Sequence, residues 1–527
     1  MPNKTFIRTG RREFDGLIPL ISAFLEKDML EMTVDGKVVS GFRTPDAKSI
    51  WIRDHSDMLR AGRYFTSDVT TAIDHFAETQ SATGRIFDYF STFPEKPPSE
   101  KENWTKYVRV PVEADVEYRF VKAAYLAWQA TGDDEWMVSL LPCLEKAVEY
   151  ILNHRWYWDT ERGLVKRAYT IDTWDFAYTA GSHDWLQFQI DENTFWGIMH
   201  GDNSGYYEAF LILATLNERL GNSIKSEKWK KRATTLSERM SEVCWNGSFY
   251  THFVKMADVD ISGVDEASQL SLSNPMAINR GVTTHEMAVG IIREYMRRKE
   301  RTNAFAEWFS IDPPFPDGIF GDDKLVGGAY VNGGIMPLVG GELAKAAFEH
   351  GFEEYGVDIL MRYHKMISES GETYLWYFPD GSPATVETST SPEAEPTDGW
   401  GSSAMLWAFI TGLAGVEDQG RGFDSVRLSP RWSAAEVTDA QVQLTYESSG
   451  KGFGYDYRCR GDGLDLVVVN SGADVRFHIL LPPETTVSSV SVDGAPAPSQ
   501  TVKVEASHYV DFAAPIKGEV GVRVDFA

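Results

Sequence analysis

The sequence predicts a mainly helical domain at residues 1–417, followed by a smaller antiparallel β-sandwich at residues 418–527. The first indication is helical periodicity, because apolar residues recur at three- and four-residue steps over 117–129 and in most of the chain up to residue 416. The second is a change of sequence pattern near Gly420. After it, Gly, Pro, Asp and Ser separate β-rich segments about every 8–12 residues. A chain of 527 residues is also too long for one ordinary core.

The helical pattern predicts a series of helices joined by loops rich in Gly, Pro and aromatic residues. Expected helices cover 117–129, which Gly132 ends, and 140–152, 206–220, 229–243, 285–298, 341–350, 355–367 and 402–413. Roughly twelve helices with such loops suggest hairpins arranged in a closed ring. Expected strands cover 426–428, 441–446, 454–460, 464–470, 476–481, 488–492, 501–504 and 521–526.

Composition excludes several classes of partner. The net charge of −26 disfavours nucleic acid and anionic membranes, which require basic surfaces, whereas neutral substrates are compatible with it. Cys143, Cys244 and Cys459 are widely spaced and form no CxxC, so we expect neither a disulfide framework nor a zinc site. The start of the chain has no apolar leader, and the apolar run at 404–416 is too short to span a bilayer. We therefore expect a soluble, cytoplasmic monomer or homodimer.

Two acidic segments carry the functional signal. Asp172 and Asp175 lie three residues apart beside Trp174, and a second acidic segment, 387–395, follows about 200 residues later and precedes Trp400. Glycoside hydrolysis requires one carboxylic acid that stays protonated and one carboxylate that stays ionised. Aromatic rings suit sugars, because sugars present apolar C–H faces as well as hydroxyl groups. The pattern therefore indicates a glycosidase, although the spacing alone would also fit ordinary helix caps.

Four stretches resemble the six-hairpin, (α/α)6-barrel glycosidases, namely the α-L-rhamnosidases, amylo-1,6-glucosidases, trehalases and processing α-glucosidases. They are 51–54 (WIRD), 173–176 (TWDF), 329–341 (AYVNGGIMPLVGG) and 387–415 with its GWGS at 399–402. Residues 418–527 resemble the C-terminal sandwich of rhamnosidase-like enzymes. The large N-terminal β-domains of rhamnosidases are absent, and their acid segment does not occur in its usual form. The resemblance implies an (α/α)6 barrel and a sugar substrate.

The resemblance also implies roles for the acidic residues. Asp175 matches the general acid of the trehalase segment, and its neighbours Trp174 and Phe176 would raise its pKa by excluding water. Asp172 is then a partner or sugar ligand. The base stays open: Glu387 matches the rhamnosidase-like position, and Glu372 matches the processing α-glucosidases. Glu393 and Glu395 also precede the Trp400 helix.

Further residues are candidates for holding the sugar. Arg53 and Asp54 match the Arg–Asp pair that binds a terminal sugar, beside Trp51, and the alternative is a structural ion pair. In the segment 200–206, His200, Asp202 and Asn203 could bind hydroxyl groups or cap a helix, and Asp202 is also conceivable as the acid. Trp174 and Trp376 are candidate walls, and Trp400 is a further candidate for binding the substrate.

Other chemistries lack their motifs. No HExxH, P-loop, dinucleotide fingerprint or GxSxG occurs, so we expect no cofactor and no catalytic metal. Asp322 and Asp323 leave a calcium site as a minor alternative.

The resulting prediction is an exo-acting, inverting glycoside hydrolase that removes a terminal sugar from an oligosaccharide or glycoside. The alternatives are a glycoside phosphorylase, or an epimerase, lyase or carbohydrate-binding protein on the same barrel.

Overall fold

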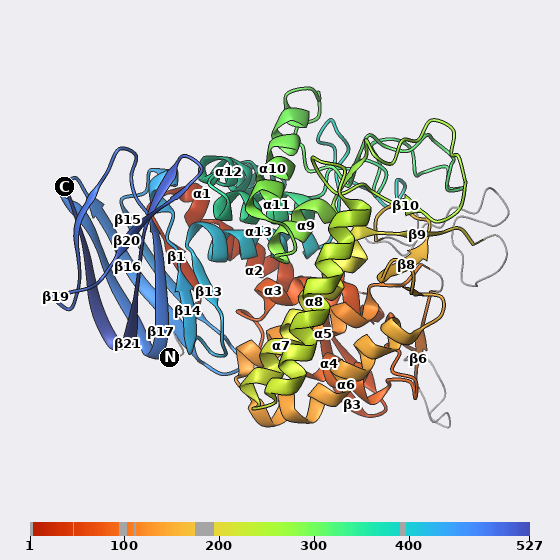
Figure 1. Cartoon of the computed structure of the whole chain (residues 1–527), viewed down its shortest axis with the longest axis horizontal. Coiled ribbons are helices and arrows are strands. Elements are labelled where there is room, and N and C mark those ends of the chain that lie inside the picture. Colours follow the sequence, from red (N-terminus) through yellow and green to blue (C-terminus); the bar gives the residue numbers. More distant parts are fainter. Residues whose placement is uncertain (1–3, 46, 94–102, 110–111, 174–193, 390–396) are drawn as a thin grey trace.

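The computed structural model describes residues 4–45, 47–93, 103–109, 112–173, 194–389 and 397–527. Helices are the main regular elements up to residue 413, and a large sheet follows them at the left of Figure 1. This confirms the predicted succession of a helical part and a β part.

Six helices follow one another around a ring. They are α3 (Ile52–Gly62), α5 (Val116–Thr131), α7 (His200–Arg219), α9 (Ser273–Asn279), α11 (Pro337–Glu349) and α13 (Trp400–Ala408), which a π-helical turn (Phe409–Leu413) extends. Each packs against the next, and α13 packs against α3. We call these the ring helices. Glycine permits the closest approach, because a Cβ at Gly341 of α11 would lie 2.4 Å from the backbone of Ala404 in α13.

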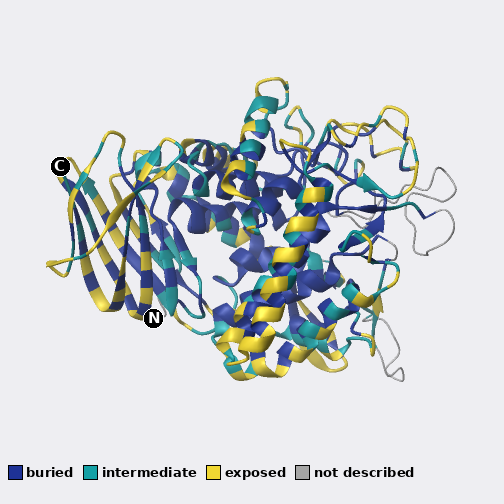
Figure 2. Ribbon diagram, in the orientation of Figure 1, coloured by how far each residue is buried: buried dark blue, intermediate teal, exposed yellow. Residues whose placement is uncertain are grey.

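A second set of helices alternates with the ring helices along the chain. It comprises α2 (Leu17–Lys27), α4 (Thr71–Glu78), α6 (Asp134–Asn153), α8 (Ser223–Cys244), α10 (His285–Lys299) and α12 (Glu353–Ser370), with the short α1 (Arg12–Asp15) before them. These helices bury one face and expose the other, as α8 shows across the front of Figure 2. Local signals bound them: Gly132 ends α5 at φ 69°, and the carboxylate of Asp133 caps α6.

Short strands connect the helices. One small sheet joins β4 (Ser49–Trp51), β5 (Tyr89–Thr92) and β6 (Trp104–Tyr107), and another joins β7 (Trp158–Asp159), β8 (Leu164–Ala168), β9 (Trp196–Ile198) and β10 (Val254–Lys255). Two further pairs are β2 (Met29–Val34) with β3 (Lys37–Phe42), and β11 (Leu270–Ser271) with β12 (Ile311–Asp312). The strands β4 and β9 end within two residues of the starts of α3 and α7, and thereby fix where those helices begin.

The C-terminal sheet has ten hydrogen-bonded strands within the described residues. Its strands after the helical part are β13 (Val416–Asp418), β14 (Ser425–Leu428), β15 (Asp439–Thr445), β16 (Gly452–Arg460), β17 (Gly463–Leu480), β18 (Val487–Val492), β19 (Ala495–Pro496), β20 (Gln500–Val504) and β21 (Ser507–Phe526). All pairings are antiparallel except that of β14 with β17. The tenth strand is β1 (Phe6–Arg8), which pairs with β15, so the N-terminal segment belongs to this sheet in space.

The sequence prediction missed part of this fold. It gave no helix at α2, α3, α4 or α9, and it divided β17 into two strands where a register shift lies between Asn470 and Ala473. Helix α3 was missed because its buried face carries charge: Asp54, Asp57 and Arg60 are all at most 6% exposed. In the part of the chain that the structure describes, no helix is both long and apolar enough to cross a membrane.

Candidate active site

The ring helices run in the same direction, so their starts gather at one end of the ring. At the starts of α3 and α5, Arg53 pairs with Asp115, and near their ends Arg63 donates to Gln129 at 2.8 Å. We call the end that holds the helix starts the front end and the opposite one the rear end. Helix N-termini carry partial positive charge and free N–H groups, which suit carboxylates and hydroxyl groups at the front end.

Arg53 is committed to carboxylates of the protein. It donates to both oxygens of Asp115, at 2.7 and 2.9 Å, and lies 3.5 Å from Asp88. Burial alone would raise the pKa of Asp115, but Arg53 outweighs it and holds the pKa well below its usual range. Arg109 pairs with Asp88 in the same network. The Arg53 guanidinium is therefore held rigidly at the front end, with an ion pair already made.

Asp54 belongs to a cluster with an excess of buried acid. The Nη1 of Arg43 lies 2.6 Å from Asp54 and 3.6 Å from the Oδ2 of Asp398, so both carboxyl groups lie beside one guanidinium. Asp28 accepts a hydrogen bond from the Gly399 N–H at 2.7 Å. One arginine thus faces three acids that are at most 4% exposed.

This excess of buried acid raises the pKa values of two of the three carboxyl groups. Burial and the nearby Asp54 raise the pKa of Asp398 to about 7, and burial and Asp398 raise the pKa of Asp28 to about 9. The Oδ1 of Asp398 accepts from the Trp400 N–H at the start of α13, whereas Oδ2 has no hydrogen-bond partner among the described residues. Asp398 therefore combines a pKa near neutrality with a carboxyl oxygen that is not hydrogen-bonded.

Asp172 is held by hydrogen bonds at the starts of α7 and α9. Its carboxylate accepts from the Ser273 hydroxyl and, at 2.7 Å, from the Thr173 N–H, while its own N–H donates to His252 at 2.9 Å. Burial would raise the pKa of Asp172, but His200 and the serine hydroxyls lower it. Asp172 is fully buried at φ 49°, a strained conformation for a residue other than glycine. It is thus an ionised residue positioned by the protein.

The residues at the start of α7 have different environments. Asp202 contacts Arg167 at 3.1 Å, and burial raises the pKa of Asp202 to about 7. Burial lowers the pKa of His200 to about 4, so its ring is neutral, and its Nδ1 lies 3.1 Å from the Thr251 carbonyl. Asn203 bonds both backbone groups of Val165 and so fixes β8 to α7. Asn203 therefore has a structural contact, whereas Asp202 is a second carboxyl that titrates near neutrality.

The predicted aromatic residues of the site that the structure describes form two groups. Trp51 stacks on Tyr89 with ring centres 4.0 Å apart, and Arg109 lies 4.5 Å from its ring, at the partly exposed edge of the front end. Trp400 and Trp376 are buried. The indole N–H of Trp400 donates to Asp57 at 2.8 Å inside the ring, and Trp376 packs edge-on against Phe378 at 4.7 Å. Trp51 is therefore the accessible ring of the three.

The predicted catalytic residues are not brought together among the described residues. Asp175 and Trp174 lie outside them, as do Glu393 and Glu395; Thr173, the residue before that gap, is buried beside Gly201 of α7. Glu387 is exposed in a turn, where its own N–H and Thr385 lower its pKa. Glu372 pairs with Lys27 at 2.8 Å. Neither of the two predicted bases is buried, and their roles stay predictions.

Sequence reasoning did not identify Arg43, Asp28 or Asp398 as site residues. Asp398 had a usable signal, because it is the acid closest to the GWGS segment that starts α13. Arg43 and Asp28 had none, since only the tertiary fold places them beside Asp54. In the described part of the chain, no three His, Cys, Asp or Glu side chains are grouped so as to hold a metal ion.

Comparisons with known proteins show which fold this chain shares. No protein-family model matches the sequence, and a search of curated proteins gives no significant match. Solved structures do match. The α-L-rhamnosidase from Dictyoglumus thermophilum aligns over 99% of this chain and 50% of its own, with a TM-score of 0.61 and 11% identity. A GH78 rhamnosidase from Bacillus sp. GL1 aligns over 91% of this chain and 43% of its own, with a TM-score of 0.60 and 15% identity.

A third match is the α-L-rhamnosidase from Streptomyces avermitilis, complexed with L-rhamnose, at a TM-score of 0.59 and 12% identity over 99% of this chain and 42% of its own. This chain thus spans half or less of the length of these enzymes. At such identities the comparison establishes a shared fold, and the predicted resemblance to rhamnosidase-type glycosidases is confirmed at that level.

Proposed function

We propose that this chain is a glycoside hydrolase that acts on a terminal sugar with inversion of configuration. The observation that carries the proposal is the arrangement of the front end on a rhamnosidase-type fold. Buried carboxyl groups of opposite protonation gather there: Asp115 and Asp172 have lowered pKa values, and Asp202 and Asp398 have pKa values raised to about 7. Acid and base catalysis require such contrast.

We also propose that the ring helices are the inner ring of an (α/α)6 barrel. The alternation along the chain supports this, because each ring helix is preceded by a helix of the second set, from α2 before α3 to α12 before α13. The contact between α13 and α3 closes the ring. In such a barrel the helix starts would surround one substrate site.

Asp175 is the proposed general acid, on the predicted resemblance of its segment. For the base we favour Asp398 over Glu387 and Glu372. A general base works best with a pKa near the operating pH, and the Asp398 pKa of about 7 meets this. Its Oδ2 would accept a proton from water, and Arg43 would stabilise the ionised form at 3.6 Å. Trp51 would hold the terminal sugar, and Arg53 and Asp54, which are already paired with Asp115 and Arg43, would support the site behind it.

The first experiment is a screen of aryl glycosides and disaccharides, repeated with inorganic phosphate. Hydrolysis without phosphate supports the proposal, and strict dependence on phosphate would identify a phosphorylase instead. An unsaturated product would identify a lyase, and sugar binding without turnover a binding protein. The anomeric configuration of the first product, followed by NMR, tests inversion directly.

A second experiment tests the acid. In Asp175→Asn the leaving group loses its proton donor, so glycosides with poor leaving groups should lose about 10²–10⁴-fold in kcat. Glycosyl fluorides should lose far less, because fluoride needs little protonation. Undiminished activity of Asp175→Asn on natural glycosides would remove Asp175 from the mechanism and promote Asp202 or Asp172.

A further inference from the structure

A separate chamber lies at the rear end of the ring. It is a cavity of about 370 Å³, and each ring helix contributes a lining residue, namely Arg60, Lys122, Glu208, Asn279, Glu342 and Trp407. Residues of the C-terminal sheet and its connections, among them Arg476 of β17 and Gln419 between β13 and β14, line its other side. The volume lies within the range of ligand pockets. We call this space the rear chamber.

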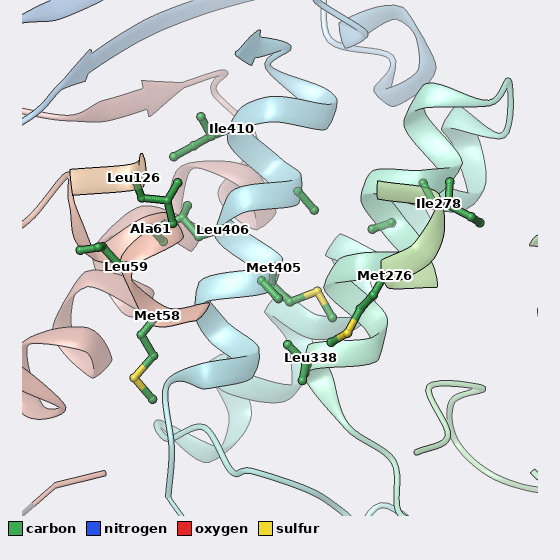
Figure 3. Close-up of a cluster of buried hydrophobic side chains, with 14 of the residues drawn as sticks. Met58, Leu59, Ala61, Leu126, Met276, Ile278, Leu338, Met405, Leu406 and Ile410 are labelled. Atoms are coloured by element: carbon green, nitrogen blue, oxygen red, sulfur yellow. The ribbon is translucent and has the colours of Figure 1, made fainter. Parts of the chain in front are cut away.

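The rear chamber is distinct from the front end. Arg60 follows Arg53 by seven residues on α3, which places it about 10 Å further along the helix axis. Between them Asp57 accepts hydrogen bonds from the Trp400 indole, at 2.8 Å, and from Arg119. Figure 3 shows Met276, Leu338 and Met405, from α9, α11 and α13, lying together inside the ring. These packed side chains separate the two ends, and Asp57, Arg119 and Met276 among them also line the chamber.

The lining is strongly charged but nearly balanced. It contains six basic residues, which are Arg60, Arg63, Arg119, Lys122, Arg280 and Arg476, and five acidic ones, which are Asp57, Glu208, Glu342, Glu417 and Asp418. Several are already paired with one another: Arg60 with Glu342, Lys122 with Glu208 and Arg119 with Asp57. An anion would meet five carboxylates, and a cation six basic groups. The balance therefore favours a neutral ligand.

The lining also presents guanidinium groups to the chamber, from Arg60, Arg63 and Arg280. The Nη2 of Arg60 and the Nε of Arg63 have no hydrogen-bond partner among the described residues, but both atoms are buried beneath the chamber surface. Carboxylate acceptors lie in the same wall, and the rings of Tyr118, Tyr125 and Trp407 add apolar surface. Mixed donors and acceptors beside aromatic rings match a molecule that presents both hydroxyl groups and C–H faces.

We infer that the rear chamber binds a neutral polyhydroxylated molecule of the size of a mono- or disaccharide, held between the ring helices and the C-terminal sheet. Binding there is independent of the proposed hydrolysis, because it involves neither Asp398 nor Asp175. It would also join the two parts of the chain, since the ligand would contact Gln419 and Arg476 together with the ring.

The test is calorimetric titration of the full chain with glucose, L-rhamnose and trehalose, and with inorganic phosphate as the anionic probe. Thr215 lines the chamber at an exposed position of α7. Thr215→Trp should obstruct the chamber and weaken sugar binding at least tenfold. Thr234→Trp is the matched control, because Thr234 is an exposed threonine on α8 that also donates to the carbonyl four residues earlier.

Asp398→Asn separates the two ends. Rear binding should persist in this variant, with the same affinity, even if turnover is lost. The inference is overturned if none of the sugars binds saturably, if phosphate binds and sugars do not, or if Thr215→Trp and Thr234→Trp bind sugar equally. Loss of sugar binding in Asp398→Asn with retention in Thr215→Trp would assign the binding to the front end.

Discussion

The two ends of the ring use buried charge differently. At the front end, Arg43 faces Asp28, Asp54 and Asp398, so acid is in excess and two of these pKa values are raised to about 7 and about 9. At the rear end, acids and bases form pairs, as in Lys122 with Glu208. Excess charge keeps a proton poised for transfer, whereas paired charge offers fixed donors and acceptors. Burial also raises the pKa of Asp418 in the rear lining, to about 6, so the stronger shifts lie at the end that we assign to chemistry.

The largest expected effect is on turnover at the front end. Asp398→Asn removes the proposed base and should lower kcat by about 10²–10⁴-fold. In the wild-type protein, the proposed activity should rise as the pH increases through about 7, because Asp398 ionises there. The measurement is kcat against pH on an aryl glycoside.

Glu387→Gln is the control for this prediction, because Glu387 is exposed. It should leave kcat within about twofold of the wild type, because the substitution of an exposed residue usually changes free energies by about 0.5 kcal/mol or less. If Glu387→Gln loses activity and Asp398→Asn retains it, the base is Glu387. The buried acids around Arg43 would then have no part in activating water.

The next effect is on stability, at the layer between the two ends. Asp57 is 6% exposed and accepts from Arg119 and Trp400. Asp57→Asn leaves the buried Arg119 with only its longer contact to Asp115, at 3.8 Å, so we expect a loss of up to about 3–5 kcal/mol in the free energy of unfolding. Urea denaturation measures it. Glu242→Gln, in the exposed pair with Arg239, should change stability by about 1 kcal/mol or less.

A third effect is the pH dependence of stability. The pKa of Asp28 is raised from 3.8 to about 9 in the folded state, so between these values the native state holds a proton that the unfolded state has released. The stability that Asp28 contributes is therefore lost as pH rises through this window. Asp28→Asn keeps an acceptor for the Gly399 N–H and cannot ionise.

Thermal unfolding of wild type and Asp28→Asn at pH 5 and pH 8 checks the sign. The variant should lose less stability than the wild type between these pH values. A parallel decline in both proteins would show that other groups dominate the window and that the excess of acid at the front end is not confined to this cluster.

Periodicity sufficed to predict most helices and the change to β structure, because α5, α6, α8, α10 and α12 have amphipathic sequences or local caps. It failed for α3, whose buried face is charged. Three residues that the sequence singled out, Arg53, Asp54 and Asp172, lie at the front end, and their roles stay predictions. The sequence singled out Arg53 and Asp54 through a family resemblance, whereas Arg43 and Asp28 join Asp398 only through folding. Spatial clusters of charge have no sequence period to reveal them.

The smallest expected effect compares two ion pairs that line the rear chamber. Lys122 and Glu208 form an ion pair there, and their side chains are 24% and 20% exposed, unlike Arg119 and Asp57 at 4% and 9%. Because water reaches the first pair, Glu208→Gln should cost about 1 kcal/mol or less, several-fold below Asp57→Asn. Urea denaturation of both variants under one set of conditions gives the ratio. Equal losses would mean that the Lys122–Glu208 pair is as poorly hydrated as the interior layer, and the rear chamber would then offer a ligand no accessible polar wall on that side.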